Sequence, residues 1–247
     1  MNLALATLVI IIFSLPGIAF RKSYFSGRFT STGFTSSLYS LVLWSFLPAL
    51  VFHGIFLSLI EYFTTYRISV ENFGFLLFSS DDKKSLDSIF LNIHDNIYNI
   101  LFYNISLILI ASILGMLFRN FVRYFGLDIT YSIFRFPNKW HYIFTGEYYD
   151  FSRGKRYHHN IDLIFIDALV EINGQGVIYS GILEDYYLSK TNEGLEQIII
   201  KYPTKKTFSV NENLEVKEIP GDFLIIPYDK IQNINYSYVA IDEEKPD

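Results

Sequence analysis

The sequence predicts a membrane protein of mixed class, with three transmembrane helices followed by a cytoplasmic small β-barrel of SH3 or Sm-like type. Three observations support this prediction. Three long segments carry no charged side chain, the residues after 160 alternate with a period of two, and positive charge is concentrated between these two parts. Charged residues make up only 18% of the chain, below the roughly 25% usual for soluble domains.

The uncharged segments cover residues 2–20, 37–60 and 97–118. Each is long enough for a helix to cross the hydrocarbon core, which takes about 20 apolar residues. A charge at the centre of such a helix costs roughly 3 kcal/mol on insertion scales. We therefore predict a transmembrane domain (1–125), a basic connector (126–160) and a β domain (161–247). The alternatives are buried core helices and, for the first segment, a cleaved signal peptide; the missing basic n-region favours an uncleaved anchor.

The distribution of Lys and Arg predicts the orientation of these spans. Positive residues follow the first and the third span, and these are Arg21, Lys22 and Arg28, then Arg119, Arg123, Arg135 and Lys139. Positive charge near span ends favours the cytoplasmic side. With three spans, both groups lie on the same side of the membrane. We therefore expect a protein of the cell membrane with its N-terminus outside and its C-terminus in the cytoplasm.

The third span carries a polar stripe. Its residues recur at helical spacing and continue into an apolar half, and they are Asn96, Asn99, Tyr103, Ser106, Ile110 and Ile113. Such a face can line a pore with a hydrophobic gate. The alternative is packing between helices, in which Asn and Ser form hydrogen bonds across a bundle. Three helices cannot enclose a channel alone, so the pore hypothesis requires a homo-oligomer.

Single residues inside the spans suggest bundle features. His53 is the only ionisable side chain at depth, and we expect a neutral imidazole bonded to a backbone carbonyl. Pro16 and Pro48 predict kinks. Gly54 and Gly115 predict close approach of neighbouring helices.

The β domain is predicted from alternation and turn signals. Apolar residues alternate over 164–172, the sequence NGQG at 173–176 is typical of a turn, and a second strand follows over 177–189. Gly181 within that strand predicts a bend or bulge. Further strands are expected at 195–202, 207–210, 223–227 and 231–241. Five or six short strands in this space favour a small closed barrel.

A basic and aromatic run precedes the β domain. Residues 119–160 carry a net charge of +4, whereas residues 161–247 carry −9. The candidate ligand-binding residues are Lys139, Trp140, Arg153, Lys155, Arg156, His158 and His159. Positive charge beside stacking rings suits single-stranded nucleic acid. Anionic lipid headgroups are the alternative partner of the same residues.

The sequence does not favour an enzyme. It contains no cysteine, and it has no Gly-rich phosphate loop, HExxH motif or nucleophile elbow. His158 and His159 are adjacent, so on a strand they would point to opposite faces and would not share a metal. We expect no metal and no cofactor.

The order of features resembles one known family. An anchor ending SLPGIAFRKSYFSGRF (14–29), two further spans, the juncture WHYIF (140–144) and a small β domain are similar to the membrane effectors of Hailong-type anti-phage defence systems. The resemblance implies a homo-oligomeric channel, for which we favour a tetramer, in a bacterial inner membrane. It also implies that single-stranded DNA oligomers from a partner nucleotidyltransferase hold the channel shut, and that their loss depolarises the cell. The alternative function is a non-conducting scaffold whose β domain recruits a protein.

Overall fold

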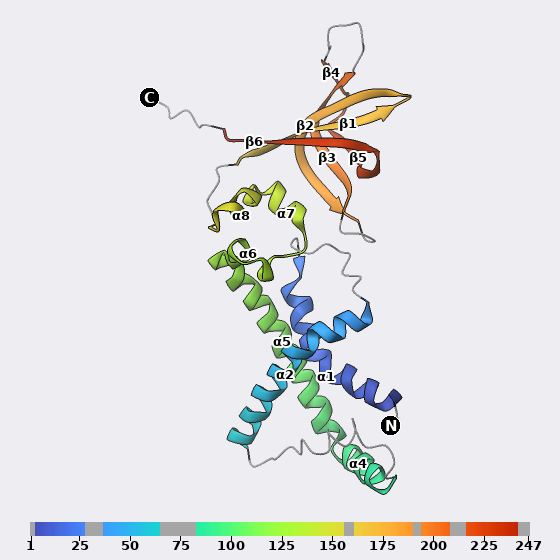
Figure 1. The fold of residues 1–247 in the computed structure, drawn as a ribbon, viewed down its shortest axis with the longest axis vertical. Coiled ribbons are helices and arrows are strands. Elements are labelled where there is room, and N and C mark those ends of the chain that lie inside the picture. Colours follow the sequence, from blue (N-terminus) through green and yellow to red (C-terminus); the bar gives the residue numbers. More distant parts are fainter. Residues whose placement is uncertain are drawn as a thin grey trace. The chain divides into compact units, whose positions relative to one another are not determined.

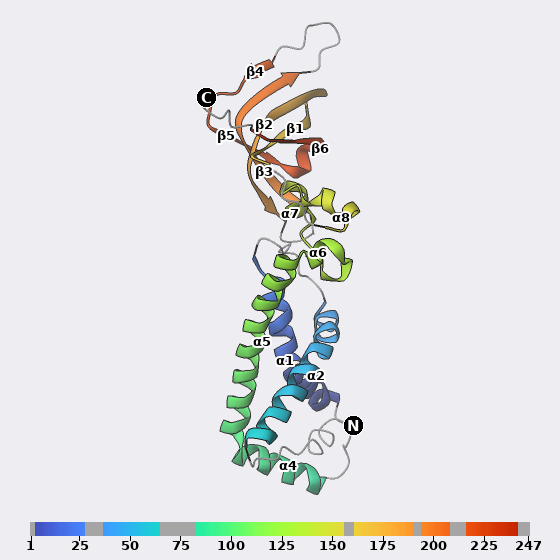
Figure 2. The same ribbon diagram turned by 90° about the vertical axis from the view of Figure 1, so that its left-hand side faces the viewer.

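The computed structural model describes residues 3–27, 37–64, 83–155, 161–189, 194–207 and 216–241. The chain forms two compact units (Figure 1, Figure 2). Unit 1 comprises Met1–Ser26 and Ser36–Phe125, and unit 2 comprises Gly27–Thr35 and Gly126–Asp247. The described part of unit 1 is helical, and that of unit 2 combines short helices with a β-sheet.

Unit 1 contains three helices that are long and apolar enough to cross a membrane, as predicted. They are α1 (Leu3–Tyr24), α2 (Leu38–Phe63) and α5 (Ile97–Phe125). At a rise of 1.5 Å per residue, the 22 residues of α1 extend for about 33 Å and the 29 of α5 for about 44 Å. Both lengths exceed a hydrocarbon core of about 30 Å. A shorter helix, α4 (Lys83–Asp95), precedes α5.

Two of these helices bend. Helix α1 contains Pro16 and helix α2 contains Pro48, and both helices change direction in Figure 1. Proline removes one backbone hydrogen bond and its ring displaces the preceding turn, which is the usual cause of a sharp kink.

Helix α1 packs against both α2 and α5, and glycine makes each contact close. A Cβ atom at Gly17 of α1 would overlap the carbonyl oxygen of Ser45 in α2. A Cβ atom at Gly115 of α5 would overlap the carbonyl oxygen of Phe20 in α1, which confirms the prediction for this glycine. No described atom of the same copy lies within 4 Å of a Cβ built at Gly54, so the prediction of a close helix contact there is not met within one copy.

Helices α1 and α5 run parallel, side by side in Figure 2. The rings of Phe20 and Tyr24 pack on Phe118 near the end of α5. Nη1 of Arg119 donates to the carbonyl oxygen of Ser26 at 3.1 Å and to its hydroxyl oxygen at 2.6 Å. The basic last turns of α1 and α5 therefore gather at one end of unit 1.

The residues predicted as a basic connector fold into five short helices of unit 2. These are α6 (Leu127–Thr130), η2 (Ser132–Phe134), α7 (Lys139–Phe144), η3 (Glu147–Tyr149) and α8 (Asp150–Arg153). The buried Asp128 carboxylate accepts a hydrogen bond from the Tyr142 hydroxyl at 3.0 Å, and that hydroxyl oxygen accepts from the Phe136 backbone N–H at 3.1 Å. The Arg135 guanidinium lies 3.9 Å from the centre of the Phe151 ring. The connector is thus a packed part of unit 2.

Within the described residues, the β-sheet is antiparallel and has six strands. They are β1 (Leu163–Ile172), β2 (Gln175–Leu188), β3 (Leu195–Thr207), β4 (Val216–Glu218), β5 (Phe223–Pro227) and β6 (Ile231–Val239). The order is β4-β3-β2-β1-β6, and β5 pairs with β3 beside β4. Asn173 and Gly174 have φ of 52° and 77°, so they form the predicted tight turn between β1 and β2. The register shifts at Gly181, as predicted.

Strand β3 is longer than predicted. The residues expected to link two strands at 203–206 continue the strand, although Tyr202 before them has a φ of 53°. Residues Gln197 to Lys201 pair with β5, and residues Thr204 to Lys206 pair with β4. The outer edge of β3 is therefore divided between two short strands.

The prediction of a closed barrel is wrong, because the sheet is not closed. Strand β6 pairs with β1, β5 pairs with β3, and no ladder joins β5 to β6 among the described residues. The two strands are linked only by η4 (Tyr228–Lys230). A connecting helix covers the core instead: Phe144 of α7 belongs to the same buried cluster as Ile166, Ile198 and Ile226. The sequence prediction assigned these residues to a basic connector and did not predict that they enter the core of the β domain.

Candidate functional site

The predicted ligand-binding residues lie partly within the described chain. Arg156, His158 and His159 lie outside the described residues. Lys139 opens α7, Arg153 ends α8, and Lys155 follows α8 after Gly154. The side chains of Lys139, Arg153 and Lys155 are exposed.

Trp140 is engaged in the core of unit 2. Its ring lies 5.5 Å from the ring of Phe144 and 5.7 Å from the ring of Tyr228. It is partly buried against the central cluster of the sheet. The contact of Trp140 with a ligand stays a prediction, and the structure assigns the ring a packing role.

Exposed tyrosines lie next to the cations at the end of α8. Tyr148 and Tyr149 of η3 are 53% and 56% exposed. The ring of Tyr149 lies 5.5 Å from that of Tyr238 in β6, and Tyr238 lies 5.7 Å from Tyr236. We use the name tyrosine–basic surface for Tyr148, Tyr149, Arg153, Lys155, Tyr236 and Tyr238. The exposed rings of Tyr148 and Tyr149 can stack on bases and the two cations can bind phosphate, whereas Tyr236 and Tyr238 are partly buried behind them and Tyr236 packs on the core of unit 2.

Two phenol groups of this surface, those of Tyr236 and Tyr238, have a raised pKa. Burial raises the pKa of Tyr238, and the neighbouring Tyr236 and Tyr149 add to the shift. Burial also raises the pKa of Tyr236, with smaller contributions from Tyr149 and Tyr148. The Tyr238 hydroxyl donates to the backbone carbonyl of Ile143, which ties β6 to α7.

The sequence prediction overlooked Tyr236 and Tyr238. The signal that could have found them was their spacing, because two tyrosines two residues apart in a strand share one face. The helix that packs on this face belongs to the folded connector. The alternation of residues in the strand does not predict how the connector folds.

The predicted pore-lining residues lie at the margin of one face of α5, the face that packs against the neighbouring helices. The buried residues of α5 are Leu107, Ala111, Gly115 and Val122. Tyr103 and Ser106 are half-buried, whereas Asn99, Ile110 and Ile113 are exposed, with 56% exposure at Ile113. Asn96 directly precedes the helix, and its side-chain amide donates to the Asn92 carbonyl and side-chain oxygens, both at 3.0 Å.

One polar contact connects all three long helices of unit 1. Nε2 of His53 in α2 lies 3.0 Å from the carbonyl oxygen of Phe13 in α1, as the sequence predicted. Nδ1 lies 2.7 Å from the hydroxyl of Tyr103 in α5. A carbonyl only accepts, so Nε2 carries the proton and Nδ1 accepts from Tyr103. Tyr103 is thus committed to a helix–helix bond within one copy.

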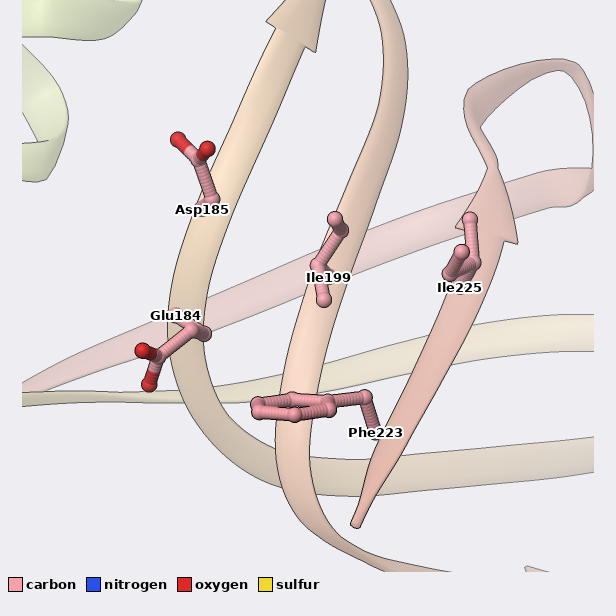
Figure 3. A pocket seen from close by; sticks show the side chains of 5 residues that line it. All are labelled: Glu184, Asp185, Ile199, Phe223 and Ile225. Atoms are coloured by element: carbon pink, nitrogen blue, oxygen red, sulfur yellow. The ribbon is translucent and has the colours of Figure 1, made fainter. Parts of the chain in front are cut away.

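Two grooves open on the sheet of unit 2. The first, of about 290 Å³, is lined by Glu184, Asp185, Ile199, Phe223 and Ile225 (Figure 3). The second, of about 490 Å³, runs between α7 and the facing parts of β1 and β2, where Asp162 and Glu184 contribute carboxylates. Within the described residues no group of three or more His, Asp or Glu side chains is placed to hold a metal ion.

Comparison with known proteins assigns the chain to no family. No protein-family model, curated protein or solved structure matches the chain. The helices identify a multi-pass membrane protein that carries an antiparallel β-sheet. Any narrower function rests on the site itself.

Proposed function

We propose that the protein is a homo-oligomeric membrane channel that is gated by an anionic ligand at the tyrosine–basic surface of unit 2. The proposed ligand class is a single-stranded oligonucleotide. The proposed setting is a bacterial inner membrane, with unit 2 in the cytoplasm and a role in anti-phage defence by depolarisation. We favour a tetramer.

The two faces of α5 carry the channel part of this proposal. One face packs on α1 through Ala111 and Gly115. The predicted pore stripe leaves Asn99, Ile110 and Ile113 uncovered in a single copy. A polar group near the bilayer is stabilised by a protein partner or by water rather than by lipid tails. A polar entrance followed by an apolar constriction suits a gate that closes by dewetting.

The chemistry of unit 2 supports the ligand class. Arg153 and Lys155 supply positive charge, and Tyr148 and Tyr149 present exposed rings in the turns before them. Stacking of a base on an aromatic ring contributes about 1–3 kcal/mol and tolerates any sequence. Lipid headgroups are the competing partner, because they would use the same cations and tyrosine rings also suit a membrane interface.

Charge reversal tests the ligand. We expect Arg153→Glu and Lys155→Glu each to weaken binding of a fluorescent single-stranded oligothymidine to the purified protein. For each phosphate that the variant no longer neutralises, the slope of log affinity against log salt should become shallower by about 0.7. Binding is measured by fluorescence anisotropy over a range of salt concentrations.

The matched control is Lys230→Glu, which reverses one exposed charge in the same unit, 3.5 Å from Asp229. This variant should keep the wild-type salt slope. Equal weakening in all three variants would mean that net charge alone drives binding, and the assignment of the surface would be wrong. Unchanged binding in both test variants would leave lipid as their partner.

A non-conducting scaffold is the second candidate, and the groove of Figure 3 favours it. Phe223 and Ile225 are 53% and 54% exposed beside an open sheet edge, where an extended peptide of a partner protein can add a strand. Charge reversal at Lys155 and Arg156 should spare such recruitment, although it should weaken oligonucleotide binding.

A further inference from the structure

The described sheet has two kinds of free edge. Strand β4 carries Lys217 and Glu218, and the part of β2 that extends beyond its pairing with β1 carries Glu184 and Asp185. Charged residues on an edge are a common device against association with another sheet. These two edges are therefore protected in the usual way.

Strands β5 and β6 lack this protection. Strand β5 reads FLIIP and β6 reads IQNINYSYV, without a single charged residue. Each pairs on one side only among the described residues, β5 with β3 and β6 with β1. The surrounding segment 161–247 carries a net charge of −9, so the absence of charge is specific to these two strands.

An apolar groove continues from the edge of β5. Ile225 pairs with Ile199 across the strands, and the ring of Phe223 lies beneath them at the foot of the groove in Figure 3. Both β5 residues are more than half exposed. Exposed apolar surface beside an unprotected edge is a typical association surface.

We infer that β5 of one copy of this chain pairs with β6 of the next copy, in a head-to-tail contact. The edges lie on opposite sides of the same sheet, and neither brings a carboxylate into the contact despite the acidity of unit 2. Pairing of β5 with β5 would leave the equally unprotected β6 uncovered. A repeated head-to-tail contact forms a ring when the rotation between copies closes, and a closed ring is what the proposed channel requires. The inference deepens the proposed function by naming the surface through which the oligomer assembles.

The neighbouring inner faces also match. Leu224 and Ile226 of β5 point toward the core, as do Ile234 and Tyr236 of β6. Joining the edges in register continues one apolar layer from copy to copy. A shift of one residue would bring the inward residues of β5 beside outward residues of β6 such as Asn235, so the pattern also favours one register.

Cross-linking tests the contact, because the chain has no cysteine of its own. Ile225→Cys and Asn235→Cys place one thiol each on exposed positions of β5 and β6. The two variants are co-expressed with different tags and treated in membranes with a short bismaleimide. We expect a dimer band that contains both tags. As a control, Val216→Cys, 61% exposed on β4, is combined with Asn235→Cys and should give no such band.

The outcomes separate this contact from the others. Self-cross-linking of Ile225→Cys alone would indicate β5–β5 pairing and overturn the inference. Absence of the mixed dimer, in membranes where the tagged copies co-purify, would overturn it as well. The proposed function is tested separately from this contact. A mixed dimer without ion flux would contradict the channel but not the edge contact. Ion flux without a mixed dimer would contradict the edge contact but not the channel.

Discussion

Three tyrosine hydroxyl groups form hydrogen bonds that connect different elements of this protein. The hydroxyl of Tyr103 bonds His53 between helices, that of Tyr142 bonds the buried Asp128, and that of Tyr238 ties β6 to α7. Each is a long side chain whose ring packs in an apolar layer while its tip reaches a polar partner. An isolated polar group in such layers would be costly, so each tip selects one arrangement of its neighbours.

The Tyr238 contact predicts a pH dependence. Burial raises the pKa of this phenol above its unfolded value of about 10, so its contribution is present below that pH and is lost as pH rises through the folded-state pKa. We expect the melting temperature of the wild type to fall as the pH rises above about 10, and that of Tyr238→Phe to fall less steeply. Thermal unfolding in detergent, followed by circular dichroism, measures both slopes. The control is Tyr202→Phe, with 65% of the side chain exposed, and a slope reduced equally there would contradict the assignment.

At the residue scale, the sequence predicted a hydrogen bond correctly where the partner of the side chain was a backbone group. The bond from His53 to a carbonyl was predicted, because every helix supplies carbonyl oxygens. Its second partner, Tyr103, was predicted to line a pore instead. A helical spacing places Tyr103 on a face but does not identify the helix that the face meets.

Glycine determines how closely the helices of unit 1 pack. Gly17 and Gly115 allow α1 to approach α2 and α5 closely enough that no side chain would fit. Gly54, of the same residue type and also in the middle of a helix, meets nothing within 4 Å. Composition alone treats these glycines alike, so only the helix crossing separates them.

These glycines provide a matched pair of variants. We expect Gly115→Ala to lower the stability of unit 1 by about 1–3 kcal/mol, because its methyl group would overlap the Phe20 carbonyl and force α5 away from α1. Gly54→Ala should be neutral or slightly stabilising, by up to about 1 kcal/mol of helix propensity. Unfolding in mixed micelles with increasing denaturing detergent compares the two variants. A destabilisation at Gly54 equal to that at Gly115 would contradict the helix crossing described above.

Elements with a clear hydrophobic pattern or a local turn signal were predictable from the sequence. Elements that form only through packing were not. The three spans, the turn at Asn173 and the irregularity at Gly181 follow from local sequence. The three residues of β4 and the one-turn helices α6 and α8 are too short to show a period. The site residues Tyr236 and Tyr238 were overlooked for a related reason, since they meet Tyr149 and α7 only when the connector folds.

At the scale of the whole molecule, the open sheet is the main departure from prediction. Strand number and spacing predicted a barrel, and the structure leaves β5 and β6 unpaired with each other. Phe144 of α7 covers the core that a closed barrel would have sealed. The alternation of a strand sets its inward face but not its last partner, so closure is decided by segments outside the strands.

The proposed assembly would account for both the open edge of the sheet and the uncovered stripe on α5. In it, copies would pair through unit 2 and surround a pore with their α5 helices, and the tyrosine–basic surface would bind the ligand. Ion conduction distinguishes the two candidate functions, because a scaffold could use the same edge without any ion path.

The most direct test is therefore ion flux from liposomes that contain the purified protein, with and without a short single-stranded oligonucleotide. We predict flux in the absence of the oligonucleotide and its suppression when the oligonucleotide is present on the side of unit 2. Arg153→Glu with Lys155→Glu should conduct but resist suppression. No flux from correctly inserted oligomers under either condition would contradict the channel and leave the scaffold as the function of this protein.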